Sequence, residues 1–275
     1  MAHPQIAVFA RLANGGDPPS RVIAGQQTKL GRTMHDIRYD AVHDEIYVTN
    51  PFAQAILAFR ASANGEEAPV RIIQGPHTEL QTPDVLEIDT VHNEIYVPDT
   101  GAIHVYRLGA QGDVAPLRTL RFSGGLGEGG IAVDPIHNVL VNAASIRNGD
   151  KRQAALLIFN RTDAGDAKPK AIISGPKTGL IGTRQLCIYP PGGWLVVSQI
   201  TSGEEPEPAG TFVGVWSVND NGDVPPRWRI DGKPSNVMKK PRGVVVDPKH
   251  KAVIVSDMRL NAVLTFYLPE MFTAR

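Results

Sequence analysis

The sequence predicts an all-β fold in which one four-stranded antiparallel unit is copied along the chain, and three observations support this. A short apolar segment, ending in Asp in four of its copies, recurs at intervals of roughly fifty residues. A second apolar run follows each copy after a short turn. Long stretches with helical periodicity are absent. The first segment occupies residues 35–40, 84–89, 129–134, 184–189 and 242–247. Units of this kind stack as the blades of a β-propeller.

The second copy shows the four strands in order. We expect strand A at residues 85–89, strand B at 94–97, strand C at 102–106 and strand D at 117–121. Turn-forming residues separate them, including Pro98-Asp-Thr-Gly101 between B and C. Short strands with turn signals between them are typical of an antiparallel meander.

The loops repeat as well as the strands. The C–D loops contain Asn-Gly or a related pair in each copy, followed in all five copies by a proline four residues after the glycine. Gly and Asn supply the positive φ of tight turns, and the proline stiffens the entry to strand D. The D–A connections share the pattern Gly-Pro-x-Thr-x-Leu at residues 75–80 and 175–180, with a weaker relative at 25–30.

The strand count leaves the closure of the ring open. The sequence supplies five A, five B and five D strands but six C-like strands, so the chain starts and ends within a blade. We favour a single domain over residues 1–275 with five blades, closed by pairing of the N-terminal D strand, residues 21–24, with the C-terminal blade. The surplus strand at residues 6–10 either lies outside the ring, pairs with another subunit or belongs to a sixth, incomplete blade.

Composition narrows the classes of partner. The 275 residues carry 28 basic and 28 acidic side chains. The net charge is zero and no apolar run has membrane-spanning length, so we expect neither nucleic-acid binding nor membrane insertion. The N-terminus shows no signal peptide, so we expect a protein that is either cytoplasmic or exported with its leader removed. The lone Cys187 excludes an internal disulfide and is expected to be a small core residue.

The residues of the repeat resemble those of a known family. Pro241-Arg-Gly-Val-Val-Val-Asp-Pro together with Ala252-Val-Ile-Val-Ser-Asp257 looks like the NHL-type repeat. The Gly-Asp-Val-Ala-Pro and Gly-Pro-x-Thr-x-Leu segments are similar to long-unit NHL-like repeats of bacterial proteins of unknown role. The resemblance covers nearly the whole chain and implies a β-propeller. It implies no particular activity, because propellers host both binding and catalysis.

Four histidines fall at one position of the repeat. Each lies three residues after an aspartate, in the A–B turn, and equivalent positions in different blades are too far apart to share one metal ion. We expect the aspartates to accept backbone N–H bonds in these turns. The four pairs are Asp40 and His43, Asp89 and His92, Asp134 and His137, and Asp247 and His250.

The residue before each strand A differs between copies, unlike the rest of the repeat. We expect these residues at the mouth of the central channel, where D–A and B–C connections meet. Arginine forks suit carboxylate or phosphate groups, so one interpretation is a site for a small anionic or polar ligand. The other is a structural ion pair between Asp84 and an arginine. The candidate residues are His35, Asp84, Glu128, Arg184 and Arg242.

Charged residues also occupy the same register within two A strands. Arg38 and Glu87 stand where the other copies hold Ala132, Cys187 and Val245. We expect either a buried ion pair or a contribution to the ligand site. Two B–C connections are enlarged, the basic residues 143–153 and the acidic residues 199–210, and each is either a functional loop or a tolerated insertion.

Three classes of function follow. The leading hypothesis is a non-enzymatic propeller that binds a protein or a small polar molecule and needs no cofactor. The first alternative is a metal-assisted hydrolase or lyase, as in propeller lactonases, with a divalent cation held by oxygen ligands. Its weak candidate ligands are Asn50, Asp99 and Asp257, beside Asp84 and Glu128. The second alternative is a structural subunit that forms a homo-oligomer through the surplus strand.

Overall fold

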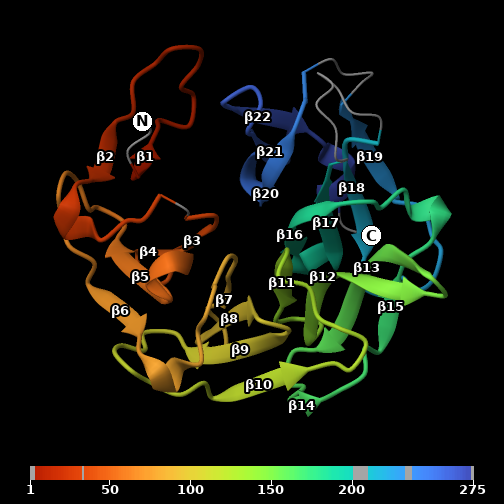
Figure 1. The fold of residues 1–275 in the computed structure, drawn as a ribbon. Coiled ribbons are helices and arrows are strands. Elements are labelled where there is room, and N and C mark those ends of the chain that lie inside the picture. The colour runs from red at the N-terminus through yellow and green to blue at the C-terminus, as the bar shows by residue number, and fades with distance from the viewer. Residues whose placement is uncertain (1–3, 33, 201–209, 233–236, 274–275) are drawn as a thin grey trace. The chain divides into compact units, whose positions relative to one another are not determined.

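The computed structural model describes residues 4–32, 34–200, 210–232 and 237–273, which fold into β-strands joined by turns and short 3₁₀ helices (Figure 1). The fold is a β-propeller with five blades, as the repeat predicts. The chain divides into two compact units. Unit 1 comprises residues 1–100 and 104–118, and unit 2 comprises residues 101–103 and 119–275. A single domain over residues 1–275 stays a prediction.

Unit 1 contains the first complete sheet, preceded by a strand pair. The pair is β1 Gln5–Val8 and β2 Arg21–Ala24. The sheet has the order β3 Ile37–Asp40, β4 Glu45–Asn50, β5 Ala55–Arg60 and β6 Arg71–Gln74. The next sheet has segments in both units: β7 Glu87–Asp89, β8 Glu94–Asp99, β9 Ala102–Arg107 and β10 Arg118–Arg121, with the short β14 Gly165–Asp166 parallel to β10.

Unit 2 contains the remaining three sheets. The first is β11 Ile131–Asp134, β12 Val139–Asn148, β13 Lys151–Asn160 and β15 Ala171–Ile173. The second is β16 Thr183–Tyr189, β17 Trp194–Gln199, β18 Phe212–Ser217 and β19 Trp228–Asp231. The third has three strands, β20 Pro241–Asp247, β21 Ala252–Asp257 and β22 Ala262–Tyr267. The predicted assignment of A, B, C and D strands is confirmed.

Among the described residues, seven short 3₁₀ helices lie between strands or, in the case of η7, after the last strand. They are η1 Gln26–Thr28, η2 Pro51–Ala53, η3 Pro76–Thr78, η4 Pro176–Thr178, η5 Pro190–Gly192, η6 Pro248–His250 and η7 Pro269–Phe272. The Gly-Pro-x-Thr-x-Leu motif forms η3 and η4. In η3, Thr78 Oγ1 donates to the Gly75 carbonyl at 2.6 Å and accepts from the Leu80 amide at 3.3 Å. The motif is therefore a self-contained turn, and Gly75 permits it with a φ of 137°.

The two repeated loop motifs contact each other. The carboxylate of Asp113, in a Gly-Asp-Val-Ala-Pro loop, accepts from the His77 amide of η3 at 2.7 Å. Asp223 makes the same 2.7 Å bond to the Lys177 amide of η4. A parallel bridge joins Ile73 to Gly112 beside the first of these contacts. Each C–D loop therefore caps the D–A connection of the preceding sheet, which explains why both motifs recur.

The core lies between successive sheets. We call the side of a sheet that faces the preceding sheet its front face, and the opposite side its back face. In unit 2, buried residues from the back face of the β11–β15 sheet and the front face of the β16–β19 sheet form one hydrophobic cluster. The back face contributes Ala132, Val141, Leu156 and Ile158, and the front face contributes Leu186, Leu195, Val197 and Phe212.

The surplus strand has a partner that the sequence did not reveal. β1 pairs with β2 in antiparallel register, from Gln5 with Ala24 to Val8 with Arg21, as a C strand pairs with a D strand. The other edge of β2 forms a parallel bridge from Ile23 to Gly65. β2, which we expected to join the last blade, therefore has both edges in use. The predicted pairing of β2 with the last blade is not observed, since β20–β22 form a three-stranded sheet without it among the described residues.

Candidate functional site

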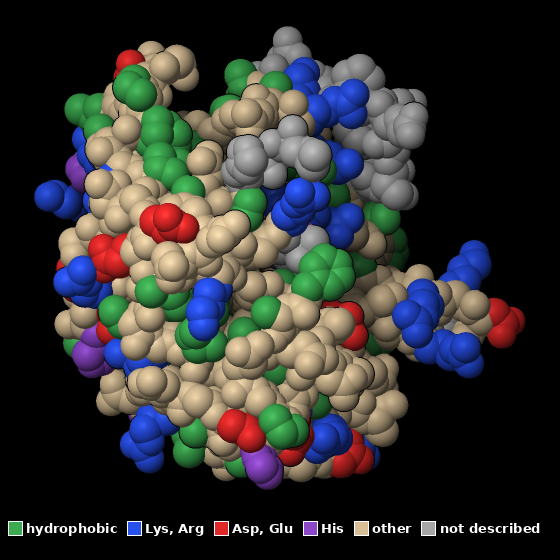
Figure 2. All heavy atoms as spheres, turned by 60° about the vertical axis from the view of Figure 1, so that its left-hand side comes forward, with side chains coloured by type: hydrophobic (Ala, Val, Ile, Leu, Met, Phe, Trp, Pro, Cys, Tyr) green, Lys and Arg blue, Asp and Glu red, His purple; other side chains and the backbone are tan. Residues whose placement is uncertain are grey.

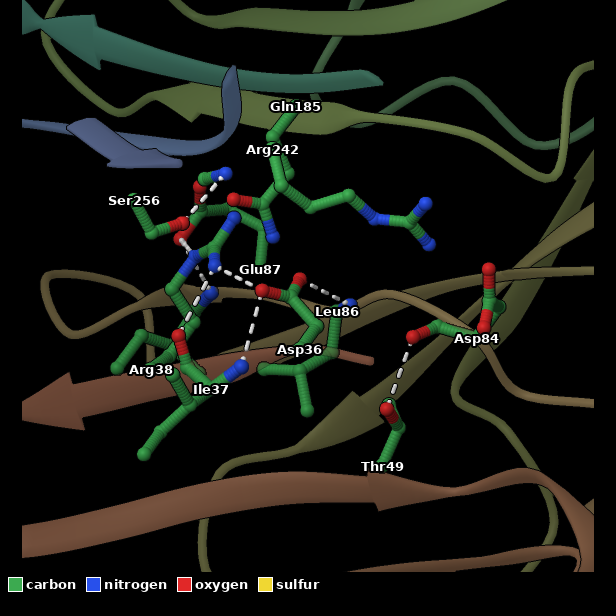
Figure 3. Close-up of polar contacts among 12 residues, drawn as sticks. Asp36, Ile37, Arg38, Thr49, Asp84, Leu86, Glu87, Gln185, Arg242 and Ser256 are labelled. Atoms are coloured by element: carbon green, nitrogen blue, oxygen red, sulfur yellow. Dashed lines mark hydrogen bonds and ion pairs between the residues drawn. The ribbon is translucent and has the colours of Figure 1, made fainter. Parts of the chain in front are cut away.

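In both units, a hydroxyl from strand B binds a carbonyl close to the start of the following strand A. In unit 1, Thr49 of β4 donates from Oγ1 to the carbonyl of Asp84 at 2.9 Å (Figure 3). In unit 2, Ser198 of β17 donates from Oγ to the carbonyl of Arg242 at 2.9 Å. Both hydroxyl-bearing side chains are completely buried. The positions singled out by the sequence are therefore held by the same backbone contact, and only their side chains differ.

The side chains of His35 and Asp84 form an ion pair in unit 1 through Nδ1 and Oδ1. Both side chains are partly exposed. The sequence suggested an arginine as the structural partner of Asp84, but the structure gives this role to a histidine. The pair brings together two of the predicted site residues.

Arg38 and Glu87 also meet, and a third residue joins them. Arg38 Nε donates to Glu87 Oε1 at 3.0 Å, and its Nη1 donates to Asp36 Oδ1 at 2.5 Å (Figure 3). The Asp36 carboxylate also accepts from the Ile37 and Leu86 amides. The predicted ion pair is thus part of a mostly buried cluster of one guanidinium and two carboxyl groups. Sequence reasoning missed Asp36, although it lies two residues before Arg38.

Burial dominates the electrostatics of this cluster. It raises the pKa of both Asp36 and Glu87, although the positive charge of Arg38 opposes the change. Burial lowers the pKa of Arg38, but attraction to Glu87 and Asp36 outweighs it, so that pKa is raised. The guanidinium therefore keeps its charge, and the two carboxyl groups hold protons more firmly than free ones do. All four predicted site residues of unit 1 are engaged with one another or with Asp36.

The two predicted arginines of unit 2 occupy matching irregularities in neighbouring strands. The register of β16 shifts between Thr183 and Leu186, and that of β20 shifts between Pro241 and Val244. Arg184 and Arg242 lie within these β-bulges, which re-aim side chains at the ends of strands. Arg184 is exposed and Arg242 is half-buried. The guanidinium of Arg242 makes no hydrogen bond or ion pair with the described residues (Figure 3).

Serine hydroxyls join the two bulges. Ser198 Oγ accepts from the Gln185 amide at 3.0 Å and donates to the Arg242 carbonyl, so one oxygen contacts both bulges. Ser256 Oγ accepts from the Gly243 amide at 2.8 Å. A Cβ at Gly243 would lie 2.7 Å from that oxygen and 3.0 Å from Gln185 Oε1, so a larger residue there would displace these side chains. The two arginines consequently project from one tightly bonded part of unit 2.

The remaining predicted site residue, Glu128, belongs to the loop before β11. Glu128 is exposed. A Cβ at the nearby Gly130 would lie 3.0 Å from the Arg184 carbonyl, so the loop runs close to the start of β16. Unit 2 therefore brings Glu128, Arg184 and Arg242 to the starts of three successive A strands.

The weak metal candidates bind backbone amides and carbonyls. Asp99 accepts from the Gln81 and Thr82 amides, and Asp257 accepts from the Lys239 and Lys240 amides. Asn50 donates to the Lys29 carbonyl. All three side chains are buried and brace the D–A loops. Within the described part of the chain, no group of three His, Cys, Asp or Glu side chains is placed to hold a metal. The divalent cation stays a prediction.

The four turn histidines behave alike. In each turn the aspartate accepts from the histidine amide, as predicted, and its other oxygen lies 2.6–2.7 Å from the histidine Nδ1. The contact between the side chains was not predicted. A turn that is satisfied internally needs no ligand, so these residues are structural.

The basic B–C connection is not a loop. Residues 143–153 are mostly strand, because β12 and β13 pair over ten residues from Val139–Asn160 to Asn148–Lys151. The prediction of a loop there is wrong, since the strands extend past the end of the sheet. Most of the acidic connection, residues 201–209 of 199–210, lies outside the described residues. On the face drawn in Figure 2, acidic and basic side chains are interspersed.

Comparisons with known proteins bear on the fold. No protein-family model matches the sequence, and no curated protein matches it. A hydrazine synthase structure from Kuenenia stuttgartiensis aligns with a TM-score of 0.56 and 13% identity, covering 91% of this chain and 67% of that chain. A chain in a nidogen/laminin complex aligns with a TM-score of 0.57 and 13% identity, covering 98% of this chain and 93% of that chain.

These similarities show the fold alone. They support a β-propeller, a fold compatible with binding or scaffold roles. The NHL-type repeat stays a resemblance, because no family comparison confirms it. In the described part of the chain, no helix has both the length and the apolar character required to cross a bilayer.

Proposed function

We propose that this β-propeller is a non-enzymatic binding protein that captures an acidic group of a protein partner or small polar molecule at the starts of the A strands of unit 2. Arg184 and Arg242 are the contact residues, and Glu128 lies at the rim and selects against surplus negative charge. The observation that carries the proposal is the pair of matching β-bulges, which present two arginines from the A strands of two successive sheets.

The contrast with unit 1 supports this choice of residues. There the polar side chains bind one another in the His35–Asp84 pair and in the Asp36–Arg38–Glu87 cluster. A guanidinium already bound to two carboxyl groups has little capacity for a ligand. Arg242 has no such partner among the described residues. Arginine binds carboxylates through two parallel N–H bonds, so arginines at the starts of two successive A strands suit an acidic group.

The test uses a fluorescein-labelled hexaglutamate peptide and fluorescence anisotropy. We expect saturable binding that weakens as salt is added, because partly exposed charges are screened. The double variant Arg184→Gln/Arg242→Gln should weaken binding by about tenfold or more. Arg227→Gln is the matched control, because this arginine of unit 2 pairs with Asp220 near a C–D loop. Circular dichroism should show all variants folded.

Two outcomes would overturn the proposal. One is that hexaglutamate binds the wild type no better than hexalysine does. The other is that the double variant and Arg227→Gln lose affinity equally, which would indicate a general charge effect. Capture of hexaglutamate by the wild type and its selective loss in the double variant support the assignment.

A further inference from the structure

A groove of about 640 Å³ opens in unit 1, away from the charged residues considered above. Its lining includes Val8 and Phe9 at the end of β1, Ile37 and Tyr39 of β3, and Arg21 and Asp44. We call it the N-terminal groove. Phe9, Ile37 and Tyr39 are about half exposed, which is unusual for large apolar side chains in the strand region of a repeat. Figure 2 shows hydrophobic side chains gathered at the upper left of the drawn face, where the N-terminal strands lie.

The repeat shows what covers this surface elsewhere. By position in strand A, Ile37 corresponds to Val244 of β20 and Tyr39 corresponds to Val246. In unit 2, the back face of the β16–β17 hairpin packs against Val244 and Val246, through Cys187, Tyr189, Trp194 and Val196. Val244 is only 7% exposed, whereas Ile37 is 48% exposed and Tyr39 is 57% exposed. The surface of β3 is therefore of a kind that an A–B hairpin buries.

The strands that precede β3 explain the exposure. β1 and β2 are a C and a D strand, and their Ile6 and Ile23 pack on Ile46, Leu57 and Phe59 of the first complete sheet. They do not reach strand A. Among the described strands of unit 1, β1 pairs on one side only, with β2. The groove thus lies beside a strand edge with free hydrogen-bonding groups, at the place where strands A and B stand in other copies.

We propose that the N-terminal groove is a docking site for a β-hairpin of the A–B type supplied by another polypeptide. The second strand of that hairpin pairs antiparallel with the open edge of β1, as B strands pair with C strands throughout this chain. Its alternate apolar side chains cover Ile37 and Tyr39. Main-chain pairing gives affinity and the apolar pockets give selectivity in such strand addition.

A second copy of this chain is a poor source of the hairpin. Each of its B strands already pairs with an A strand on one side and a C strand on the other. No B strand of the described fold therefore has an edge with which to meet β1. The occupant required is a hairpin whose second strand is unpaired, with a short turn and alternating apolar residues.

The experiment uses a peptide with the sequence of residues 184–199, because that hairpin covers the equivalent surface in unit 2. The peptide carries Ala in place of Cys187 and a fluorescein label, and the full chain is titrated into it. We expect saturable binding that Tyr39→Asp weakens by about tenfold or more. Phe52→Asp is the control, because Phe52 is 84% exposed in the same unit but lies outside the groove. A peptide carrying W194D and V196D, which lacks the apolar back face, should not bind.

Three outcomes would overturn the proposal. Equal effects of Tyr39→Asp and Phe52→Asp would show that the peptide does not use the groove. Light scattering that finds a wild-type dimer dissociated by Tyr39→Asp would assign the groove to a second copy. Peptide binding that appears only after Thr265→Pro, a disruption of β22, would assign it to the last strand of the same chain. The groove and the two arginines are separate sites, so hexaglutamate binding should be unaffected by Tyr39→Asp.

Discussion

The starts of the A strands in the two units have the same backbone contacts and opposite chemistry. In both units a buried hydroxyl of strand B holds the carbonyl at the start of the next strand A. Unit 1 places charged side chains inside this frame, where Arg38 binds Asp36 and Glu87. Unit 2 places apolar side chains there, including Ala132 and Cys187, and its arginines lie on bulges. One repeat therefore supports either an internal charge cluster or outward-facing charges.

This difference indicates what each unit contributes. A buried guanidinium with two carboxyl partners is costly to desolvate and more costly to leave incomplete. It favours one arrangement of β3 against β7 and leaves little capacity for a ligand. The bulges of unit 2 have their amides bound by serine hydroxyls, so the arginine side chains are not needed to hold the backbone. Binding function is therefore expected in unit 2.

The largest expected effect is the loss of Arg38. Arg38→Met leaves two buried carboxyl groups without their cation, and we expect unfolding to become easier by about 3–5 kcal/mol. Urea unfolding followed by circular dichroism measures this. Val245→Ala is the matched control, since Val245 holds the same register in unit 2 but is half exposed, and its cost should stay within about 0.5 kcal/mol.

A compensating variant sharpens the comparison. Asp36→Asn/Arg38→Met/Glu87→Gln removes all three charges, so it should recover part of the stability lost in Arg38→Met. The loss of unfolding free energy in Arg38→Met should also become smaller as the pH falls. Protonation then neutralises the two carboxyl groups, which repel each other once the arginine is removed. A loss below about 1 kcal/mol for Arg38→Met would show that the three residues do not act as a unit.

The next largest loss of stability is expected from removing the two buried hydroxyl contacts. Thr49→Val and Ser198→Ala each leave a backbone carbonyl without its donor, and we expect each to cost about 1–3 kcal/mol. Ser198→Ala should cost somewhat more than Thr49→Val, because it also removes the acceptor of the Gln185 amide, while the two carbonyl bonds are both 2.9 Å long. Urea unfolding of the two variants provides the comparison. A loss of stability in only one of the two variants would mean that the hydroxyl contact does not stabilise the two units in the same way.

The parts of the fold that the sequence predicted depend on contacts close in the chain. Alternating apolar residues predicted the strands, and an aspartate three residues before a histidine predicted the turns. The Asp36 contact escaped prediction because it depends on Leu86 and Arg38 in two neighbouring sheets. The bulges at residues 184–185 and 242–243 escaped it because a register shift leaves little trace in apolar periodicity.

Strand pairing explains the other differences. The sequence correctly indicated a surplus strand at residues 6–10 but not that β1 pairs with β2. The N-terminal groove follows from that pairing. The strands beside the first complete sheet are a C strand and a D strand, β1 and β2, and no A or B strand in the described part of unit 1 covers β3. The extension of β12 and β13 over residues 143–153 was missed because polar strand residues there resemble a loop. The β1–β2 and β12–β13 pairs join consecutive strands, whereas the groove also depends on residues of β3 that lie further along the chain.

The smallest expected effect concerns an Asp–His turn. Burial raises the pKa of Asp40, but hydrogen bonds from the His43 side chain and from the His43 and Val42 amides outweigh it, so the pKa is lowered. A carboxyl whose pKa is lower in the folded state stabilises the fold above its unfolded value of about 4, and this stabilisation is lost as the pH falls through the folded value. Asp40→Asn should cost about 1 kcal/mol at neutral pH.

The pH profile separates this effect from a loss of packing. The stability difference between wild type and Asp40→Asn should be constant above about pH 5 and should vanish in acid, where Asp40 is protonated. Asp247→Asn is the matched variant in unit 2, where the same 2.7 Å contact to His250 involves a more exposed carboxylate, 21% against none for Asp40. Its cost at neutral pH should be smaller, because water competes for the carboxylate. A difference for Asp40→Asn that persists unchanged to pH 2 would mean that the asparagine acts through shape alone, and the turn would then owe nothing to its charge.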